Sequence, residues 1–116
     1  MKTQSKLGVT LPNKYLIYSA FLYEDEADWA VAEVLENTFN APIVWERISE
    51  GINRGKLDGA FPANKTWVFI TQDGNDTFKS SIRRLSDDQV EVSTYLNNIL
   101  SDNILTATSI EIRVYP

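Results

Sequence analysis

Trp29 is the side chain with the clearest capacity to bind another molecule, because it lies among carboxylates in the sequence. Asp25 and Glu26 precede it, and Glu33 and Glu36 follow it. On a helix, these carboxylates would lie one or two turns from the indole. An exposed indole flanked by carboxylates can receive an arginine or lysine side chain through cation–π and ion-pair contacts. We therefore predict a surface for a basic protein partner here; the competing interpretation is that another segment covers Trp29.

A second group of aromatic residues is predicted to lie on one face of a sheet. Trp45, Trp67 and Phe69 belong to segments rich in β-branched and aromatic residues, which favour strands. Alternate residues of a strand point to the same face of its sheet. We expect these three rings on the open face of the sheet, with Tyr115 as a further candidate. Contiguous aromatic side chains there would need a binding partner, a second copy of the chain or a covering segment.

The residue types that the chain lacks limit its chemistry. The sequence has no histidine and no cysteine, which removes the commonest general base near neutral pH, thiol chemistry and nearly all zinc sites. The glycines of segment 51–56 lack the spacing of a phosphate-binding loop. Asp73, Asn75 and Asp76 lack the alternating ligand spacing of a calcium loop. We therefore expect no catalytic residue, no cofactor and no metal site.

The charge balance favours a basic protein over a nucleic acid as the partner. The chain carries 16 acidic residues against 11 lysines and arginines, which gives a net charge of −5. Nucleic-acid binding depends on basic residues that neutralise phosphates, so we expect no nucleic-acid partner. No apolar run reaches the ~20 residues that cross a bilayer, and the first residues lack the apolar stretch of a secretion signal. With no cysteine, we expect a cytoplasmic protein without membrane contact.

Four segments have the composition of strands, and the residues after the first of them have helical spacing. The strand segments are 14–23, 43–48, 66–71 and 108–115, and the first is apolar on both faces, as in a central strand. Residues 24–40 have the spacing of a helix. Its apolar stripe contains Ala27, Ala30, Val31, Val34, Leu35 and Phe39. Glycines and a proline mark a long connection between the second and third strand segments.

The region after residue 75 allows more than one interpretation. Residues 76–86 fit a helix, a strand or a loop. Ser86 and Gln89 have the spacing of a capping box, which predicts a second helix extending to about Leu100. Val90 and Val92 alternate with polar residues, so an extended segment over 89–95 is the alternative.

The resulting order of strand, helix, strand, strand, helix, strand predicts an α+β fold of the ferredoxin-like type. Such a fold is a four-stranded antiparallel sheet with both helices on one face. The length fits one domain over residues 1–116, with residues 1–13 as a flexible arm.

These features together predict a non-enzymatic protein-binding module. One specific form is a small acidic inhibitor or immunity-type protein, of bacterial or phage origin, that neutralises a basic partner. A homodimer through the open sheet face is compatible with this reading. One alternative is a dimeric small-molecule sensor, which needs an apolar pocket between the long connection and the first helix. The other is a small α+β-barrel-like enzyme that would rely on Tyr, Arg, Asp or Glu.

Overall fold

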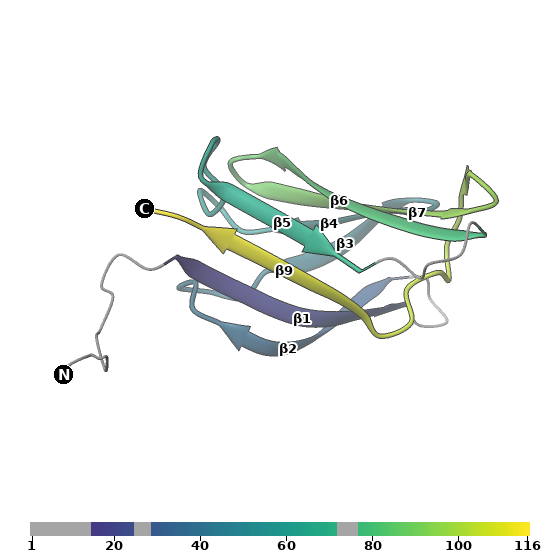
Figure 1. The fold of residues 1–116 in the computed structure, drawn as a ribbon, viewed down its shortest axis with the longest axis horizontal. Coiled ribbons are helices and arrows are strands. Elements are labelled where there is room, and N and C mark those ends of the chain that lie inside the picture. Colours follow the sequence, from purple (N-terminus) through teal and green to yellow (C-terminus); the bar gives the residue numbers. More distant parts are fainter. Residues whose placement is uncertain (1–14, 25–28, 72–76) are drawn as a thin grey trace.

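The computed structural model describes residues 15–24, 29–71 and 77–116, which form two antiparallel β-sheets (Figure 1). These described residues contain nine strands and no helix. In chain order the strands are β1 (Leu16–Glu24), β2 (Ala30–Asn37), β3 (Val44–Ser49), β4 (Ile52–Lys56), β5 (Thr66–Ile70), β6 (Phe78–Ser86), β7 (Gln89–Leu96), β8 (Ile99–Leu100) and β9 (Thr108–Val114). In this part of the chain, no helix is long and apolar enough to cross a membrane.

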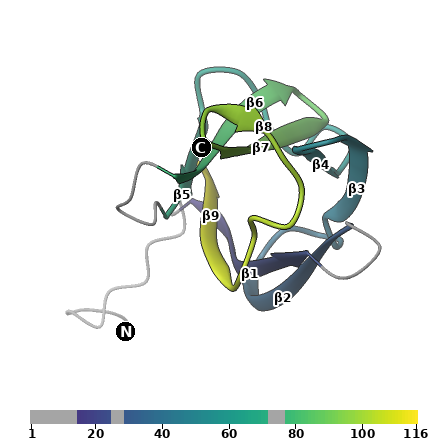
Figure 2. The same ribbon diagram turned by 90° about the vertical axis from the view of Figure 1, so that its right-hand side faces the viewer.

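The chain crosses repeatedly between the two sheets. Sheet 1 has the strand order β2-β1-β9-β5, and sheet 2 has the order β3-β4-β7-β6, with the short β8 paired to the end of β7. The connections from β2, β4, β5 and β8 to the next strand each pass to the other sheet, so the sheets lie face to face as a sandwich (Figure 2). β1 and β9 are central in sheet 1, whereas β2 and β5 form its edges.

The core lies between the sheets and consists of alternate residues of their strands. Tyr18, Ala20 and Leu22 of β1 belong to the same buried cluster as Val90 and Val92 of β7. Segments between the strands complete this cluster with two fully enclosed side chains, Phe61 and Leu105. Burial of this apolar surface, at about 25 cal/mol per Å², is the main favourable term for a chain without disulfides.

Two hydrogen bonds join the sheets across this interior. The indole Nε1 of Trp45 in β3 donates to the hydroxyl of Tyr18 in β1 at 3.2 Å. The amide of Ala30, at the start of β2, donates to Oδ1 of the buried Asn53 in β4 at 3.3 Å. Both bonds satisfy polar groups that would otherwise be costly to bury.

The prediction of an α+β, ferredoxin-like fold is wrong, because both predicted helices are strands. Residues 30–37, assigned to the first helix, form β2 and pair with Tyr18–Glu24 of β1. Pairing of this kind overrides a weak local preference for helix. The Asn37 side chain accepts a hydrogen bond from the Phe39 amide at 2.9 Å, which turns the chain after β2. The described residues also lack the α+β-barrel architecture of the enzyme alternative.

The second predicted helix is part of the hairpin of β6 and β7. Ser86 Oγ accepts a hydrogen bond from the Asp88 amide at 3.2 Å inside the tight turn, so it caps no helix. Val90 and Val92 are fully buried on one face of β7. The alternative of an extended segment over 89–95 is therefore confirmed, and the ambiguous residues before it form β6 from Phe78 onward.

The four predicted strands are confirmed as β1, β3, β5 and β9, with ends that differ by at most two residues. β1 is central in its sheet, as its two apolar faces predicted. The long connection after β3 contains a strand, β4, that the sequence pattern did not indicate. Residues 1–13, predicted as a flexible arm, lie outside the described residues.

Candidate functional site

Trp45 belongs to the core and not to an open sheet face. Only 9% of its surface is exposed, and its indole donates to the Tyr18 hydroxyl. Burial raises the pKa of Tyr18, so this hydroxyl stays protonated at neutral pH. The predicted faces of this strand are inverted, because Val44 and Ile48 are exposed whereas Trp45 is buried. Trp45 is therefore removed from the candidate binding residues.

Trp67 and Phe69 lie exposed on the outer face of sheet 1, as predicted. They are alternate residues of the edge strand β5 and keep 44% and 46% of their surfaces exposed. Their rings are parallel within 2°, with centroids 6.0 Å apart. Two large apolar rings held in parallel at the surface are unusual enough to indicate a contact surface. Their role in binding stays a prediction.

An arginine on the neighbouring strand organises the aromatic side chains around this pair. The Arg113 Cζ atom of β9 lies 4.5 Å from the centroid of the Tyr15 ring and 5.1 Å from that of Trp67. The Tyr15 and Tyr115 rings are 5.2 Å apart. Arg113 Nη1 donates to the Tyr115 hydroxyl at 3.3 Å, and its Nε pairs with Glu111. We call Tyr15, Trp67, Phe69 and Tyr115, with Arg113 and Glu111, the aromatic platform.

Arg113 is fully charged and held in place. The hydrogen bond to Tyr115 and the ion pair with Glu111 raise its pKa above the ordinary value for arginine. The Tyr15 and Trp67 rings hold the guanidinium through cation–π contacts. The cross-strand register, which places Trp67 opposite Arg113, brings these groups together. Sequence alternation indicates which residues of β9 share a face, but only the register shows that Arg113 lies opposite Trp67.

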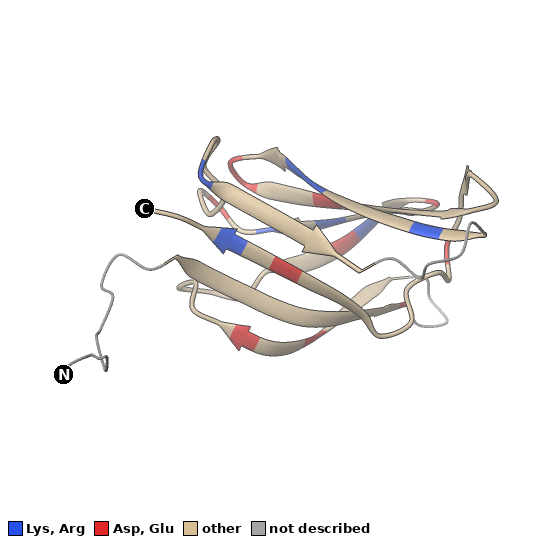
Figure 3. Cartoon of the chain, in the orientation of Figure 1, with Lys and Arg blue, Asp and Glu red and all other residues tan. Residues whose placement is uncertain are grey.

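The other edge of sheet 1 is acidic. The sequence from residue 15 to residue 43 contains no lysine or arginine and six acidic residues: Glu24, Asp25, Glu26, Asp28, Glu33 and Glu36. In Figure 3, the described part of the β1–β2 hairpin is coloured for acidic residues and for no basic ones. Asp25 and Glu26, predicted as site residues, lie outside the described residues. Glu33 and Glu36 are exposed on β2.

Trp29 lies directly before β2, and 49% of its surface is exposed. No segment of the described residues covers it fully, and its role in binding stays a prediction. The apolar side chains that accompany it along β2 are exposed as well, up to 61% for Leu35. We call Trp29 and the exposed β2 residues, Val31, Glu33, Val34, Leu35 and Glu36, the acidic edge.

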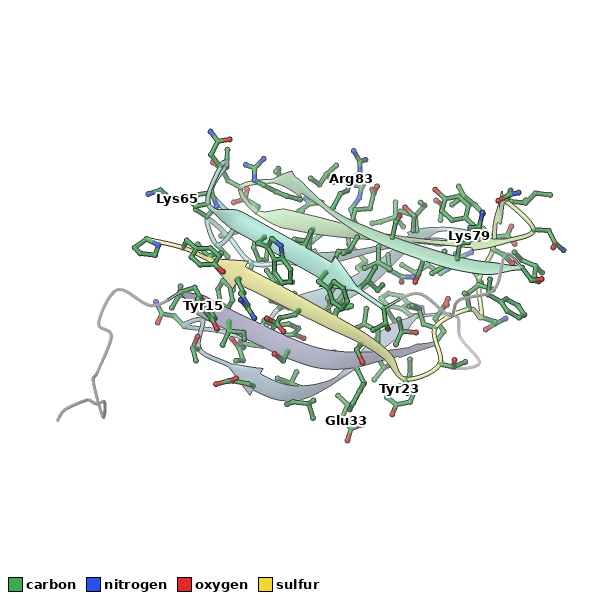
Figure 4. All side chains as sticks on the ribbon, in the orientation of Figure 1. Tyr15, Tyr23, Glu33, Lys65, Lys79 and Arg83 are labelled. Carbon is green, nitrogen blue, oxygen red and sulfur yellow. The ribbon has the colours of Figure 1, made fainter. Side chains whose placement is uncertain are left out.

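Glu33 is tied to the neighbouring strand by a tyrosine. The Tyr23 hydroxyl of β1 donates to Glu33 Oε1 at 3.3 Å, and Figure 4 shows both side chains projecting from the β1–β2 hairpin. Desolvation and the adjacent Glu33 carboxylate raise the pKa of Tyr23, which keeps the hydroxyl a donor.

One side of the β2 backbone pairs with no strand of the described residues, although sheet 2 covers its Ala30 end. β2 pairs with β1 and forms the edge of sheet 1 (Figure 1). The Ala30 amide points away from β1, because it donates to Asn53 of sheet 2. Amide directions alternate along an antiparallel strand, so the amides of Ala32 and Val34 also point away from β1. A bulge at Leu35 ends this regular stretch.

The outer face of sheet 2 is charged but internally paired. Glu46, Arg54, Glu91 and Arg83 lie opposite one another on four successive strands. Glu91 binds Arg54 at 3.0 Å and Arg83 at 2.9 Å. Although its burial opposes ionisation, hydrogen bonds from Arg83 and Arg54 lower the pKa of Glu91 below its ordinary value. We assign this row to stability, since its charges already have partners.

Two hollows on the surface are small. One, of about 280 Å³, lies beside the long connection and is lined by Leu16, Phe39, Asn40, Leu57–Ala60, Pro62 and Val114. The other, of about 140 Å³, lies between the start of β6 and the segment before β9. Both fall below the ~300–1,000 Å³ of typical ligand pockets. The sensor alternative also required a first helix, which is β2 in the structure.

The described residues include no cluster of three or more acidic side chains arranged to hold a metal ion. What the geometry does bring together is an aromatic platform on one edge of sheet 1 and an acidic edge on the other. Compared with family models, curated protein sequences and solved structures, the chain matches none of them.

Proposed function

We propose that this chain is a non-enzymatic protein-binding module that takes a basic, extended segment of another protein along the acidic edge. The observation that carries the proposal is a stretch of six acidic residues and no lysine or arginine, within residues 15–43, which includes the edge strand β2. An inhibitor or immunity-type protein that neutralises a basic partner is its most specific form, and the cysteine-free composition suits the cytoplasm.

Charge and apolar contact support this proposal together. Carboxylates of one sign along an edge steer a basic partner towards it and disfavour acidic competitors. The exposed Trp29 indole can contact an arginine or lysine of the partner through its ring face. Val31, Val34 and Leu35 offer apolar surface to the residues between those basic ones.

The backbone of β2 gives the partner a way to dock. An exposed edge strand is a template for a further strand, which adds main-chain hydrogen bonds to the sheet. The amides of Ala32 and Val34 point to the free side of β2. A partner segment in extended conformation, with alternating basic and apolar side chains, matches both this edge and its acidic charge.

A titration with defined peptides tests the proposal. The probe is a short synthetic peptide that alternates arginine and valine, and the control peptide has glutamate in place of arginine. We expect the double variant Glu33→Lys/Glu36→Lys to weaken binding of the basic peptide by about tenfold or more. The matched control is Glu50→Lys/Asp58→Lys, which changes the net charge equally at exposed positions away from β2.

The control variant separates a site from a general charge effect. If both double variants lose the same affinity, net charge alone governs binding and no site on β2 is needed. If the basic peptide fails to bind the wild-type chain, or the acidic peptide binds equally well, the proposal is wrong.

A further inference from the structure

We propose that the aromatic platform is a second binding site, for a neutral carbohydrate chain. This site lies on the β5 and β9 side of sheet 1, at the opposite edge from β2. It goes beyond the proposed protein binding and does not depend on it. Figure 4 shows the side chains along β5 and β9 on the face turned toward the viewer, with Tyr15 labelled at one end.

The two parallel rings suit the flat faces of sugar rings. A pyranose presents C–H groups on its faces and hydroxyl groups around its rim, so its faces pack on aromatic rings. Trp67 and Phe69 are parallel within 2° and close to half exposed. Their separation of 6.0 Å follows from the strand, since alternate residues repeat every 6 to 7 Å. Arg113 lies over the Trp67 ring, so the proposed packing uses the ring surface that Arg113 leaves open.

Polar groups around the rings match the rim of a sugar. Glu111 and Arg113 lie on the adjacent strand, opposite Phe69 and Trp67. The Tyr115 hydroxyl accepts a hydrogen bond from Arg113, and the Tyr115 side chain is exposed. The carboxylate can accept hydrogen bonds from sugar hydroxyls, and the guanidinium can donate to them. A phenolic hydroxyl can do both.

The charges on the platform favour a neutral ligand. Arg113 and Glu111 pair with each other, so the platform presents one positive and one negative charge that cancel locally. A phosphate-rich ligand would bind poorly, because Arg113 is ion-paired with Glu111 and the chain has a net charge of −5. A basic peptide would bind poorly here as well, because Glu111 is ion-paired with Arg113. The exposed carboxylates of the acidic edge suit such a peptide better.

The platform is also organised before any ligand arrives. Arg113 is held between Tyr15 and Trp67, and Tyr15 packs against Tyr115. Aromatic side chains have few rotatable bonds, so little conformational entropy is lost when they bind. A second copy of the chain is the alternative occupant, and the sedimentation experiment below distinguishes it from a glycan.

The three indole N–H signals in a proton–nitrogen NMR spectrum test the proposal on the wild-type chain. Titration uses soluble neutral glycans of different linkage: cello-, xylo-, manno- and chito-oligosaccharides. We expect at least one series to shift the Trp67 signal, while the buried Trp45 and the distant Trp29 stay unchanged. Trp67→Phe assigns the Trp67 signal. No shift with any series, or equal shifts of all three indoles, overturns the proposal.

Variants then test which residues bind. Trp67→Ala is expected to weaken the affinity for the responding glycan by about tenfold or more. Trp29→Ala is the matched control, since it removes an equally exposed indole outside the platform and should leave the affinity unchanged. Intact Trp45 and Trp29 signals show that the variant is folded. If Trp67→Ala keeps the affinity, or if it instead dissociates a dimer in sedimentation experiments, the platform is not a glycan site.

Discussion

The indole of Trp45 and the hydroxyl of Tyr18 meet across the interior, with Nε1 and the hydroxyl oxygen 3.2 Å apart. Trp45 comes from β3 of sheet 2, and Tyr18 from β1 of sheet 1. This bond therefore joins the two layers of the sandwich. It also explains why an aromatic residue that the sequence placed on an open face is buried, since its one polar atom has a partner inside.

Tyr18→Phe should destabilise the protein, because it leaves the buried indole N–H of Trp45 without this acceptor. We expect a loss of about 1–2 kcal/mol in the free energy of unfolding, measured by urea denaturation. Tyr23→Phe is the control: its hydroxyl bonds to exposed Glu33, so its removal should leave stability unchanged. Equal effects of the two substitutions would contradict the role of the bond across the core.

The Glu91 carboxylate should make stability depend on pH in the acidic range. Its pKa is lower in the folded chain than its ordinary value of 4.5, so the ionised form favours folding. This contribution is present above the unfolded pKa and is lost as the pH falls through the folded pKa. Glu91→Gln should lower stability at neutral pH by roughly 1–3 kcal/mol and reduce the further loss below about pH 4.5.

Denaturation curves at a series of pH values measure this effect. Asp87→Asn is the control, because Asp87 is largely exposed and its ion pair with Arg84 is on the surface. It should leave the pH profile of the wild-type chain unchanged. A Glu91→Gln profile parallel to that of the wild type would show that Glu91 does not titrate as the structure implies.

Gly55→Ala should disturb the contact between β4 and Trp45. A Cβ atom at this position would lie 2.8 Å from Ile43 Cγ2 and 3.0 Å from the Trp45 ring. We expect a loss of about 1–3 kcal/mol by thermal or urea unfolding, with a change in Trp45 fluorescence. Gly59→Ala, where a Cβ would meet no atom, should leave that fluorescence unchanged. Wild-type stability of Gly55→Ala would contradict the close packing.

The strands that the sequence predicted correctly are those whose composition differs from that of a helix. β1, β5 and β9 are rich in aromatic and β-branched residues, and their alternation shows without knowledge of their neighbours. For the same reason, the exposure of Trp67 and Phe69 on one face could be predicted. The face of β3 could not, because both of its sides carry large apolar residues and only the packing of Trp45 decides between them.

The errors come from segments whose pattern fits two structures. Ala30, Val31, Val34 and Leu35 have helical spacing, yet β1 supplies a pairing partner for them. In β4, the inward residues are Asn53 and Gly55, so the strand lacks the apolar alternation that would have indicated it. Such strands are defined by their neighbours, which a single sequence does not show.

Amide hydrogen exchange, followed by NMR while the basic peptide is added, tests the proposed binding at the acidic edge most directly. Addition of a strand to β2 should slow exchange at Ala32 and Val34, whose amides point to the free side, by about tenfold or more. Exchange at Val31 and Glu33, whose amides point to β1, should change much less. Unchanged exchange at Ala32 and Val34 with saturating peptide would contradict strand addition at this edge.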